Sequence, residues 1–254
     1  MTKKTILKVE NLSYSFDKSD KTKTLDKVSF SVERGSFVSI MGPSGCGKST
    51  LLRLIAGLQP SKKGAIERDF KELAMVFQSH AVFPWLTVRE NAGFGLAMKG
   101  LPKSAAERRA IVDAKLEEVG LIGTGVAANG IRDLGDSYPN QLSGGQKQRV
   151  SVARALAVSP ELLIMDEPFS SLDSITAERL KTDIFRLFKK YNMTVVMVNH
   201  LIEDAIELSD EIIVLTKGPG TVKEKIRIDL PYPRDNRSTH FFALVDKIRS
   251  LIEE

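Results

Sequence analysis

The stretch from residue 42 to residue 49 constrains the fold of this chain more than any other feature. It fits the phosphate-loop pattern G-x-x-x-x-G-K-[ST] and reads Gly42-Pro43-Ser44-Gly45-Cys46-Gly47-Lys48-Ser49. A compact apolar run, Ser36 to Met41, precedes it, and apolar residues at helical spacing follow it in Lys48 to Leu58. Such a loop needs a buried strand before it and a helix after it, because backbone N–H groups and the positive end of the helix dipole must converge on one phosphate. The sequence therefore predicts an α/β fold with a phosphate site at this turn.

Strand-like runs alternate with helical patterns along the rest of the chain, as expected for an α/β core. Apolar runs rich in Val, Ile and Leu predict buried parallel strands at Leu162 to Met165, Thr194 to Val198 and Glu211 to Leu215. Helical spacing predicts helices at Gln146 to Val158 and Ile175 to Tyr191. Alternating apolar and polar residues predict antiparallel strands at Lys8 to Phe16 and Val28 to Val32.

The organisation is predicted to be a single domain over residues 1–254. Residues 1–87 and 158–216 are assigned to the α/β core. Residues 88–157 are assigned to an inserted helical subdomain, because strand signal is sparse between Leu86 and Asn140 and Ser104 to Val119 is amphipathic. Residues 217–254 are expected to form a C-terminal extension of loop and short strand that ends in a helix, Phe241 to Ile252.

Composition and charge exclude several classes of protein. Of the 254 residues, 42% are hydrophobic and 27% charged, which excludes intrinsic disorder. The longest apolar run, Phe241 to Val245, is far shorter than the roughly 20 residues of a membrane-spanning helix, and we expect no secretory signal. A single cysteine fits a reducing cytosol, and a scattered net charge of +5 gives no reason to expect nucleic acid as a partner.

Two strand ends are expected to supply the reactive groups. Lys48 offers a mobile positive charge for the β- and γ-phosphates of a nucleotide, and the hydroxyl of Ser49 can ligate Mg²⁺. Asp166 and Glu167 follow a predicted buried strand, and ligands of open α/β sheets gather at the carboxyl ends of strands. Asp166 is therefore predicted to hold Mg²⁺, and Glu167 to orient or deprotonate a water that attacks the γ-phosphate. Cys46 is interpreted as a small space-filling residue rather than a redox group.

A second phosphate-binding helix start follows later in the chain. Ser143, Gly144 and Gly145 offer a hydroxyl and bare backbone N–H groups directly before the helix predicted from Gln146. One loop with phosphate-binding N–H groups is enough for one γ-phosphate. A second phosphate-binding helix start in the same chain therefore suggests that two chains share each nucleotide. The sequence resembles the ATP-binding subunits of ABC transporters, from about residue 6 to at least residue 216. The resemblance includes the run Leu142-Ser143-Gly144-Gly145-Gln146. In that family the pentapeptide of one subunit closes over ATP on the phosphate loop of the other.

The resemblance implies a phosphate-loop (RecA-like) core with an antiparallel β subdomain and an inserted α-helical subdomain, and ATP and Mg²⁺ as cofactors. It implies that Phe16 stacks on adenine, with Tyr14 as the rival. Gln78 matches the glutamine that reaches Mg²⁺ and the attacking water and couples the site to a membrane partner. His200 matches the switch histidine that contacts the γ-phosphate, and Asp173 matches the acidic member of a loop, 170–173, that contacts the opposite subunit.

The complete candidate set has three parts. The catalytic candidates are Lys48, Gln78, Glu167 and His200, and the metal candidates are Ser49, Gln78 and Asp166. The cofactor-binding candidates are Phe16, Gly42, Pro43, Ser44, Gly45, Cys46, Gly47, Lys48, Ser49, Thr50, Gln78, Ser143, Gly144, Gly145, Gln146 and Asp173. His80 and His240 match no family position and are interpreted as structural or surface residues.

As a functional expectation, the resemblance implies an ATP hydrolase, peripheral to the cytoplasmic face of the cell membrane. Its implied partners are a second, identical ATP-binding subunit, transmembrane permease subunits and, indirectly, an extracytoplasmic solute-binding protein, with no nucleic acid. Three segments resemble the importer branch for nitrate, sulfonate and taurine: Phe83 to Asn91, Lys217 to Gly220 and Asp229 to Arg234. The alternative is a soluble ABC ATPase of a scaffold complex, such as that of iron–sulfur cluster assembly.

The chain departs from the family pattern in length at two places. Ser61 to Lys71 is shorter than usual, and Gly120 to Ser137 is longer, with Gly123, Gly125 and Gly130 suggesting a loop. The longer segment is interpreted as a solvated loop, or as an element that adjusts recognition of the membrane subunit. The extra regulatory domain of sugar-type importer ATPases is not expected.

Overall fold

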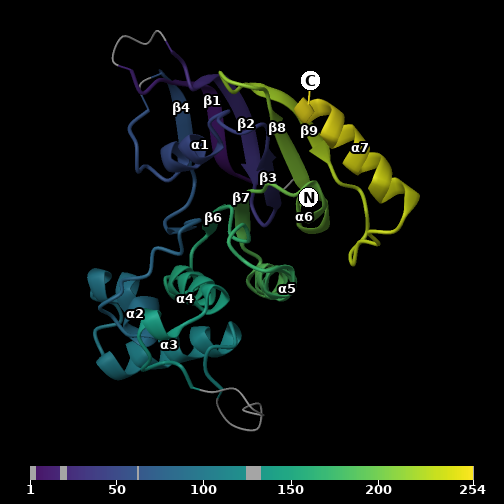
Figure 1. Cartoon of the computed structure of the whole chain (residues 1–254). Coiled ribbons are helices and arrows are strands. Elements are labelled where there is room, and N and C mark those ends of the chain that lie inside the picture. The colour runs from purple at the N-terminus through teal and green to yellow at the C-terminus, as the bar shows by residue number, and fades with distance from the viewer. Residues whose placement is uncertain (1–3, 18–21, 62, 124–132, 254) are drawn as a thin grey trace.

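The structure is a computed structural model that describes residues 4–17, 22–61, 63–123 and 133–253 (Figure 1). It contains two β-sheets in one part of the molecule and a group of helices in the other. The strands are β1 (Thr5–Tyr14), β2 (Leu25–Glu33), β3 (Phe37–Met41), β4 (Lys63–Arg68), β5 (Leu73–Val76), β6 (Leu162–Asp166), β7 (Thr194–Val198), β8 (Glu211–Leu215) and β9 (Val222–Arg227). The helices are α1 (Lys48–Ile55), α2 (Val88–Lys99), α3 (Ala105–Glu118), α4 (Gly144–Ala157), α5 (Ser174–Tyr191), α6 (Ile202–Leu208) and α7 (Thr239–Glu253), with a short 3₁₀ turn, η2 (Pro139–Gln141).

The larger sheet has the order β5-β6-β7-β3-β8-β9. Its first five strands run parallel, and β9 pairs antiparallel with β8. Every residue of β3, β6 and β7 is buried, as the apolar runs predict for strands covered on both faces. Because parallel strands end at one edge, the segments that follow β3, β6 and β7 meet there.

The smaller sheet, β2-β1-β4, is antiparallel and packs with α1 on the larger sheet. Apolar side chains from both sheets and from the helix, among them Leu7, Ile40 and Leu51, form this core. Within the segment 61–71, residues Lys63–Arg68 form the edge strand β4, paired with β1. Strand β1 ends at Tyr14, so Phe16, which the pattern placed inside the strand, lies beyond it.

The helical part consists of α2, α3 and α4, which pack against one another through Ala92, Val112, Val150 and their neighbours. Each helix begins at a capping side chain: Thr87 for α2, Ser104 for α3 and Ser143 for α4. The predicted α/β architecture with an antiparallel sheet and a helical insert is confirmed. Of the long segment Gly120 to Ser137, the glycines 125 and 130 lie outside the described residues.

The tail packs against the α/β core. Strand β9 extends the larger sheet, and α7 buries Phe241, Val245 and Ile248 against the face that carries Met41 and Ile212. The division expected at residue 216 therefore falls between two paired strands, while the subdomain boundaries as a whole stay a prediction. Among the described residues, no helix combines the length and apolar character that crossing a bilayer requires.

Candidate functional site

The phosphate loop follows β3 at the carboxyl edge of the larger sheet. Gly42 has φ 152° and Gly47 has φ 99°, backbone conformations that favour glycine. A Cβ atom at Gly42 would lie 2.8 Å from the Leu215 carbonyl oxygen, and one at Gly47 would lie 2.7 Å from Leu25 Cδ2. Helix α1 begins at Lys48, directly after the loop, so its positive N-terminal end faces the same space.

Lys48 is buried within the loop that it follows. Its Nζ donates hydrogen bonds to the carbonyl oxygens of Gly42 at 2.7 Å and Pro43 at 3.0 Å. These contacts hold the ammonium group over the loop, where a phosphate would lie between the glycine N–H groups and the positive charge.

Ser49 and Asp166 meet across the sheet edge, as the sequence predicts for two metal candidates. Ser49 Oγ donates to Asp166 Oδ1 at 3.0 Å, and burial raises the pKa of the Asp166 carboxyl. A hydroxyl and one carboxylate are hard oxygen donors of the kind that suit Mg²⁺, which takes its remaining ligands from phosphates and water. Within the described part of the chain, no group of three or more His, Cys, Asp or Glu could hold a metal ion on protein side chains alone. The donor set therefore fits a metal ion that arrives with a nucleotide.

Glu167 lies at the centre of a polar cluster. Its Oε1 is 2.5 Å from His200 Nε2, and its Oε2 accepts a hydrogen bond from Gln78 Nε2 at 2.8 Å. The same Gln78 nitrogen donates to Ser170 Oγ at 3.3 Å. Glu167 itself adopts φ 49° and its backbone N–H donates to the Val198 carbonyl oxygen, which fixes the residue between β6 and β7. The structure thus brings three of the four catalytic candidates into direct contact.

A cavity of about 440 Å³ joins the phosphate loop to this cluster. It is lined by Phe16, Thr24, Ser44, Gly45, Gly47, Lys48, Ser49, Thr50, Glu167 and His200. Phe16 is 61% exposed and lines the cavity, whereas Tyr14 packs on the core, with its ring centre 5.1 Å from that of Phe16 in a T-shaped arrangement. The geometry favours Phe16 over Tyr14 for stacking on a base.

The remaining candidates lie elsewhere on the chain. Ser143 caps α4 through a reciprocal pair of hydrogen bonds with Gln146, and Asp173 caps α5 by accepting from the Thr176 N–H at 3.0 Å. Gly145 leaves no room for a side chain beside Thr176, so these two helix starts pack together. None of Ser143 to Gln146 or Asp173 is among the residues that line the cavity at the phosphate loop.

Sequence reasoning missed a contact between the tail and the phosphate loop. The Gly220 N–H donates to the Thr24 carbonyl oxygen at 2.9 Å, and a Cβ atom at Gly220 would overlap the Cys46 carbonyl oxygen. Cys46 is fully buried beneath it, in agreement with a space-filling role, and burial raises the pKa of its thiol. Only the glycine itself signals this close approach, and nothing in the sequence says which segment it approaches.

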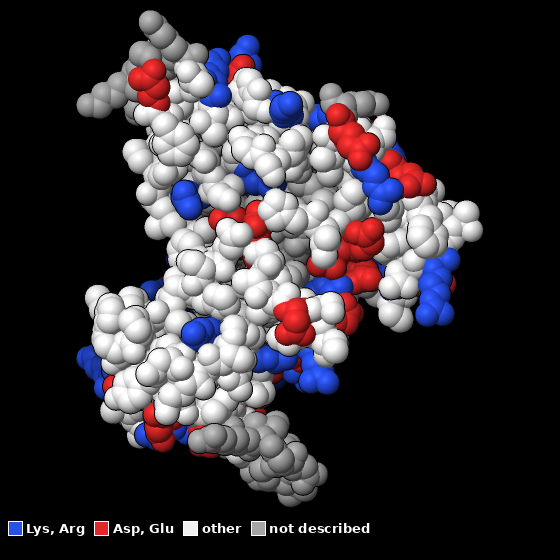
Figure 2. Space-filling model, in the orientation of Figure 1, with Lys and Arg blue, Asp and Glu red and all other residues white. Residues whose placement is uncertain are grey.

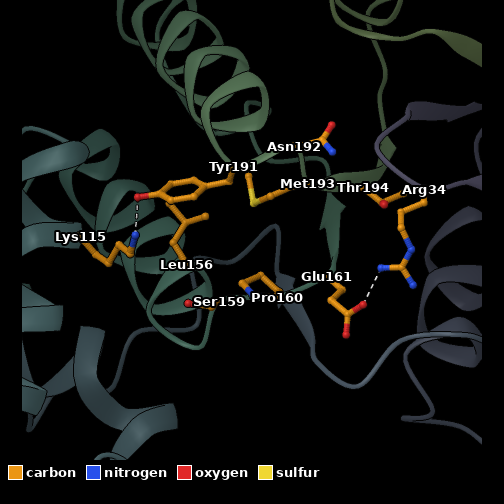
Figure 3. Close-up of a pocket in the computed structure, with 10 residues that line it drawn as sticks. All are labelled: Arg34, Lys115, Leu156, Ser159, Pro160, Glu161, Tyr191, Asn192, Met193 and Thr194. Carbon is orange, nitrogen blue, oxygen red and sulfur yellow. Dashed lines mark hydrogen bonds and ion pairs between the residues drawn. The ribbon is translucent and has the colours of Figure 1, made fainter.

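A separate cavity, of about 350 Å³, lies at the amino-terminal ends of β6 and β7, at the opposite edge of the sheet (Figure 3). None of the candidate residues lines it. Its charged side chains already have partners, since Arg34 pairs with Glu161 at 2.5 Å and Lys115 Nζ donates to Tyr191 Oη at 2.5 Å. We assign no chemistry to it.

Figure 2 shows Lys and Arg interspersed with Asp and Glu over the visible face, with no broad basic patch.

Comparisons with known proteins decide the family. The profile of the ABC transporter family matches residues 25–170. An uncharacterised ABC transporter ATP-binding protein of Methanocaldococcus jannaschii is 41% identical over 98% of this chain and 91% of its own length. This chain belongs to the ABC transporter family. It is an ATP-binding cassette, an ATPase coupled to transport, and these matches favour a transporter over the scaffold alternative.

Two further relatives carry a solute in their names. The bicarbonate transport ATP-binding protein CmpC of Synechocystis sp. is 40% identical over 89% of this chain and 34% of its own length. The nitrate import ATP-binding protein NrtC of Synechococcus elongatus is 35% identical over 91% of this chain and 35% of its own length. The chain spans about a third of each of these relatives.

The fold also matches solved ATP-binding cassettes. A dimeric cassette in a post-hydrolysis state bound to ADP and Pi gives a TM-score of 0.75 at 31% identity, over 88% of this chain and 99% of that one. The nucleotide in that structure agrees with ATP as a cofactor of this family.

Proposed function

We propose that this cassette hydrolyses ATP as a dimer and thereby powers the import of a small anion through a membrane permease. The observation that carries the proposal is that, in a single chain, the phosphate loop and the helix start at Ser143 lie in different places. Lys48, Ser49 and Glu167 line one cavity, while the helix start at Ser143 is exposed and does not line it. A second copy would supply its own Ser143 to Gln146 run to the nucleotide, so that two ATP molecules lie between two chains.

The roles of the side chains follow from the geometry. Lys48 and the start of α1 would bind the β- and γ-phosphates, and Phe16 would stack on the base. Ser49 and Asp166 would hold the Mg²⁺ that accompanies ATP, which neutralises phosphate charge when bound. Glu167 would polarise the attacking water, with Gln78 and His200 orienting its two carboxylate oxygens.

The membrane partner would dock on the helical part. A cavity of about 410 Å³ between α2 and α3 is lined mainly by apolar atoms, including those of Leu86, Phe94 and Val112. Trp85 and Met98 expose 69% and 73% of their surface nearby. Exposed apolar residues of this kind mark interaction sites, and we propose that a cytoplasmic segment of a permease occupies this groove and holds the cassette at the inner face of the membrane.

Because this chain does not touch the solute, the choice of an anion rests on the relatives named for bicarbonate and nitrate. The permease would receive that solute from an extracytoplasmic binding protein.

Mixed dimers test the shared site. Lys48→Ala disables the phosphate loop and Ser143→Arg blocks the helix start, so each variant alone should lose nearly all ATPase activity. A mixed dimer retains one intact composite site, and random exchange in an equal mixture should restore about a quarter of wild-type turnover. The control mixes Lys48→Ala with Glu167→Gln, which lie in the same half-site, and should restore nothing. Recovery in both mixtures, or in neither, would contradict a nucleotide site shared between chains.

A further inference from the structure

The turn that follows Gln78 has an unusual backbone. His80 and Ala81 adopt φ angles of 63° and 49°, a region that residues other than glycine seldom occupy, and here two neighbours occupy it in succession. Such conformations persist only where surrounding contacts hold them, and they gather at functional sites. The His80 side chain also reaches the 170–173 loop, with Nε2 at 3.4 Å from Ser171 Oγ.

Arg154 adds side-chain contacts to this turn, beside the turn's own hydrogen bonds from the His80 and Ala81 N–H groups to the carbonyl oxygens of Phe77 and Ser79. Its Nη1 donates to the Ala81 carbonyl oxygen at 2.7 Å and its Nη2 to the His80 carbonyl oxygen at 3.4 Å. The guanidinium also lies 5.7 Å from the centre of the Phe83 ring. Burial lowers the pKa of Arg154, and the described residues include no carboxylate paired with it. Arg154 is a half-buried cation that donates to backbone carbonyls, so no ion pair offsets the free-energy cost of its desolvation. Its charge-assisted hydrogen bonds instead fix the position of the backbone that they reach.

The far end of the same loop is held by Asn91. This side chain is fully buried; its Oδ1 accepts from the Phe83 N–H at 2.8 Å, and its Nδ2 donates to the carbonyl oxygens of Phe83, Leu86 and Thr87. Arg154 and Asn91 both belong to the helical part, whereas Gln78 contacts Glu167 of the α/β core. The loop is therefore tied to the helical part through Arg154 and Asn91, and to the core through Gln78 and His80.

Arg154 lies on the helix that Ser143 caps. Eleven residues of α-helix span about 16 Å, and the run from Gln146 to Ala157 contains neither Gly nor Pro at which the helix would bend. A displacement of α4 from Gln146 onward is thus carried to Arg154 as a movement of one rigid body.

We propose that Arg154 is a positioning residue for hydrolysis: it holds the turn at His80 and Ala81 so that Gln78 meets Glu167, and thereby ties helix α4 to the polar cluster at Glu167. This inference rests on the proposed roles of Gln78 and Glu167. It assigns no contact with the nucleotide to Arg154, so the effect of its loss must pass through Gln78.

The test compares Arg154→Met with Arg68→Met. Arg68 also donates to two backbone carbonyls, those of Leu54 and Ile55, but at the end of α1 and away from Gln78. Displacing a positioned group by about 1 Å costs up to about 100-fold in rate, so Arg154→Met should lower kcat by about 10- to 100-fold with KM for ATP within about twofold. Arg68→Met should leave kcat within about twofold. Arg154→Lys keeps the charge but loses the fork that spans two carbonyls, and should recover part of the rate.

A double-mutant cycle with Gln78→Ala separates positioning from general destabilisation. If Arg154 acts through Gln78, Arg154→Met causes no further loss of kcat in the Gln78→Ala background. Losses that multiply would overturn the inference, as would wild-type kcat in Arg154→Met. Wild-type kcat in Gln78→Ala would instead overturn the proposed role of Gln78, and the inference with it.

The loop carries its own reporter. Trp85 is the single tryptophan of the chain, and its ring centre lies 5.6 Å from that of Phe83, which Arg154 covers. Arg154→Met and Arg154→Lys should shift the Trp85 emission or its quenching by iodide, while Arg68→Met should not. Unchanged Trp85 fluorescence in a folded Arg154→Met protein would show that the turn does not depend on Arg154.

Discussion

Arg89 connects α2 to three aspartates. Its removal tests how strongly these ion pairs hold the residues that precede α4. Its Nε lies 2.8 Å from Asp113 on α3, its Nη2 lies 2.8 Å from Asp133, and its Nη1 lies 2.7 Å from Asp136. The Arg89 side chain is only 12% exposed, and its backbone N–H donates to the Gly135 carbonyl oxygen at 2.9 Å. Arg89→Met removes the cation while keeping most of the side-chain volume.

The size of the effect follows from the exposure of the three partners. Asp133 and Asp136 are 55% and 82% exposed, so each ion pair contributes no more than about 0.5 kcal/mol. Asp113 is 28% exposed, and leaving it without its buried partner should cost about 2 kcal/mol. The total is about 3 kcal/mol of unfolding free energy, which lowers the melting temperature by about 6–12 °C in a protein of this size.

The loss should depend on pH. The Gly135 N–H and then Arg89 outweigh the effect of burial and lower the pKa of the Asp133 carboxyl in the folded protein. A carboxyl whose pKa is lower in the folded protein than in the unfolded chain stabilises the fold at pH values above the unfolded pKa, which is near 4. This stabilisation is lost as the pH falls through the pKa of the folded protein. The part of the difference that comes from Asp133, at most about 0.5 kcal/mol, should therefore be complete at pH 7 and shrink below about pH 4.

Chemical denaturation at pH 7 and near pH 3.5 measures both quantities. Arg109→Met is the matched control, because Arg109 is 63% exposed and reaches the same Asp113 at 3.5 Å, so it should cost no more than about 0.5 kcal/mol. A loss below about 1 kcal/mol for Arg89→Met at pH 7 would refute the reasoning.

Two further predictions concern the sheet edge. Glu167→Gln should bind ATP, accumulate as an ATP-bound dimer in size-exclusion chromatography and lose hydrolysis by about a factor of 10³; wild-type turnover would remove Glu167 as the residue that activates water. Because burial raises the pKa of Asp166, its charged form opposes folding above about pH 4, so Asp166→Asn should raise the nucleotide-free unfolding free energy by roughly 0.5–2 kcal/mol and abolish further stabilisation by Mg–ATP. Thermal unfolding with and without Mg–ATP decides this, and a variant less stable than wild type would contradict it.

The meeting of Ser49 with Asp166 could be predicted from sequence although 117 positions separate them. Two rules suffice for that prediction: parallel strands share a carboxyl edge, and a phosphate loop follows one of them. The assignment of Gln78 to the site came from family resemblance, since an exposed amide after an apolar run has no signal of its own, and its hydrogen bond to Glu167 was not predicted.

Other contacts had no local pattern from which to predict them. Arg154 is bound to carbonyl oxygens, which every residue carries, so its partners cannot be read from side-chain types. Gly220 approaches Cys46 because β9 pairs with β8, a pairing that depends on the whole sheet. Strand β1 ends at Tyr14, and directly after it Ser15 Oγ donates to the Thr22 carbonyl oxygen, a contact that strand alternation does not encode.

The link through α4 also changes what the mixed dimers report. If Ser143→Arg only blocked the partner's nucleotide, the chain that carries it would keep an undisturbed Gln78 and Glu167, and the mixture would reach about a quarter of wild-type turnover. A bulky cation at the cap of α4 also displaces that helix, however, and Arg154 would pass the displacement to the turn at His80 and Ala81 of the same chain. The remaining site would then run below its normal rate. Recovery with Ser143→Arg should therefore fall short of a quarter, and recovery of a full quarter would show that α4 does not transmit the displacement.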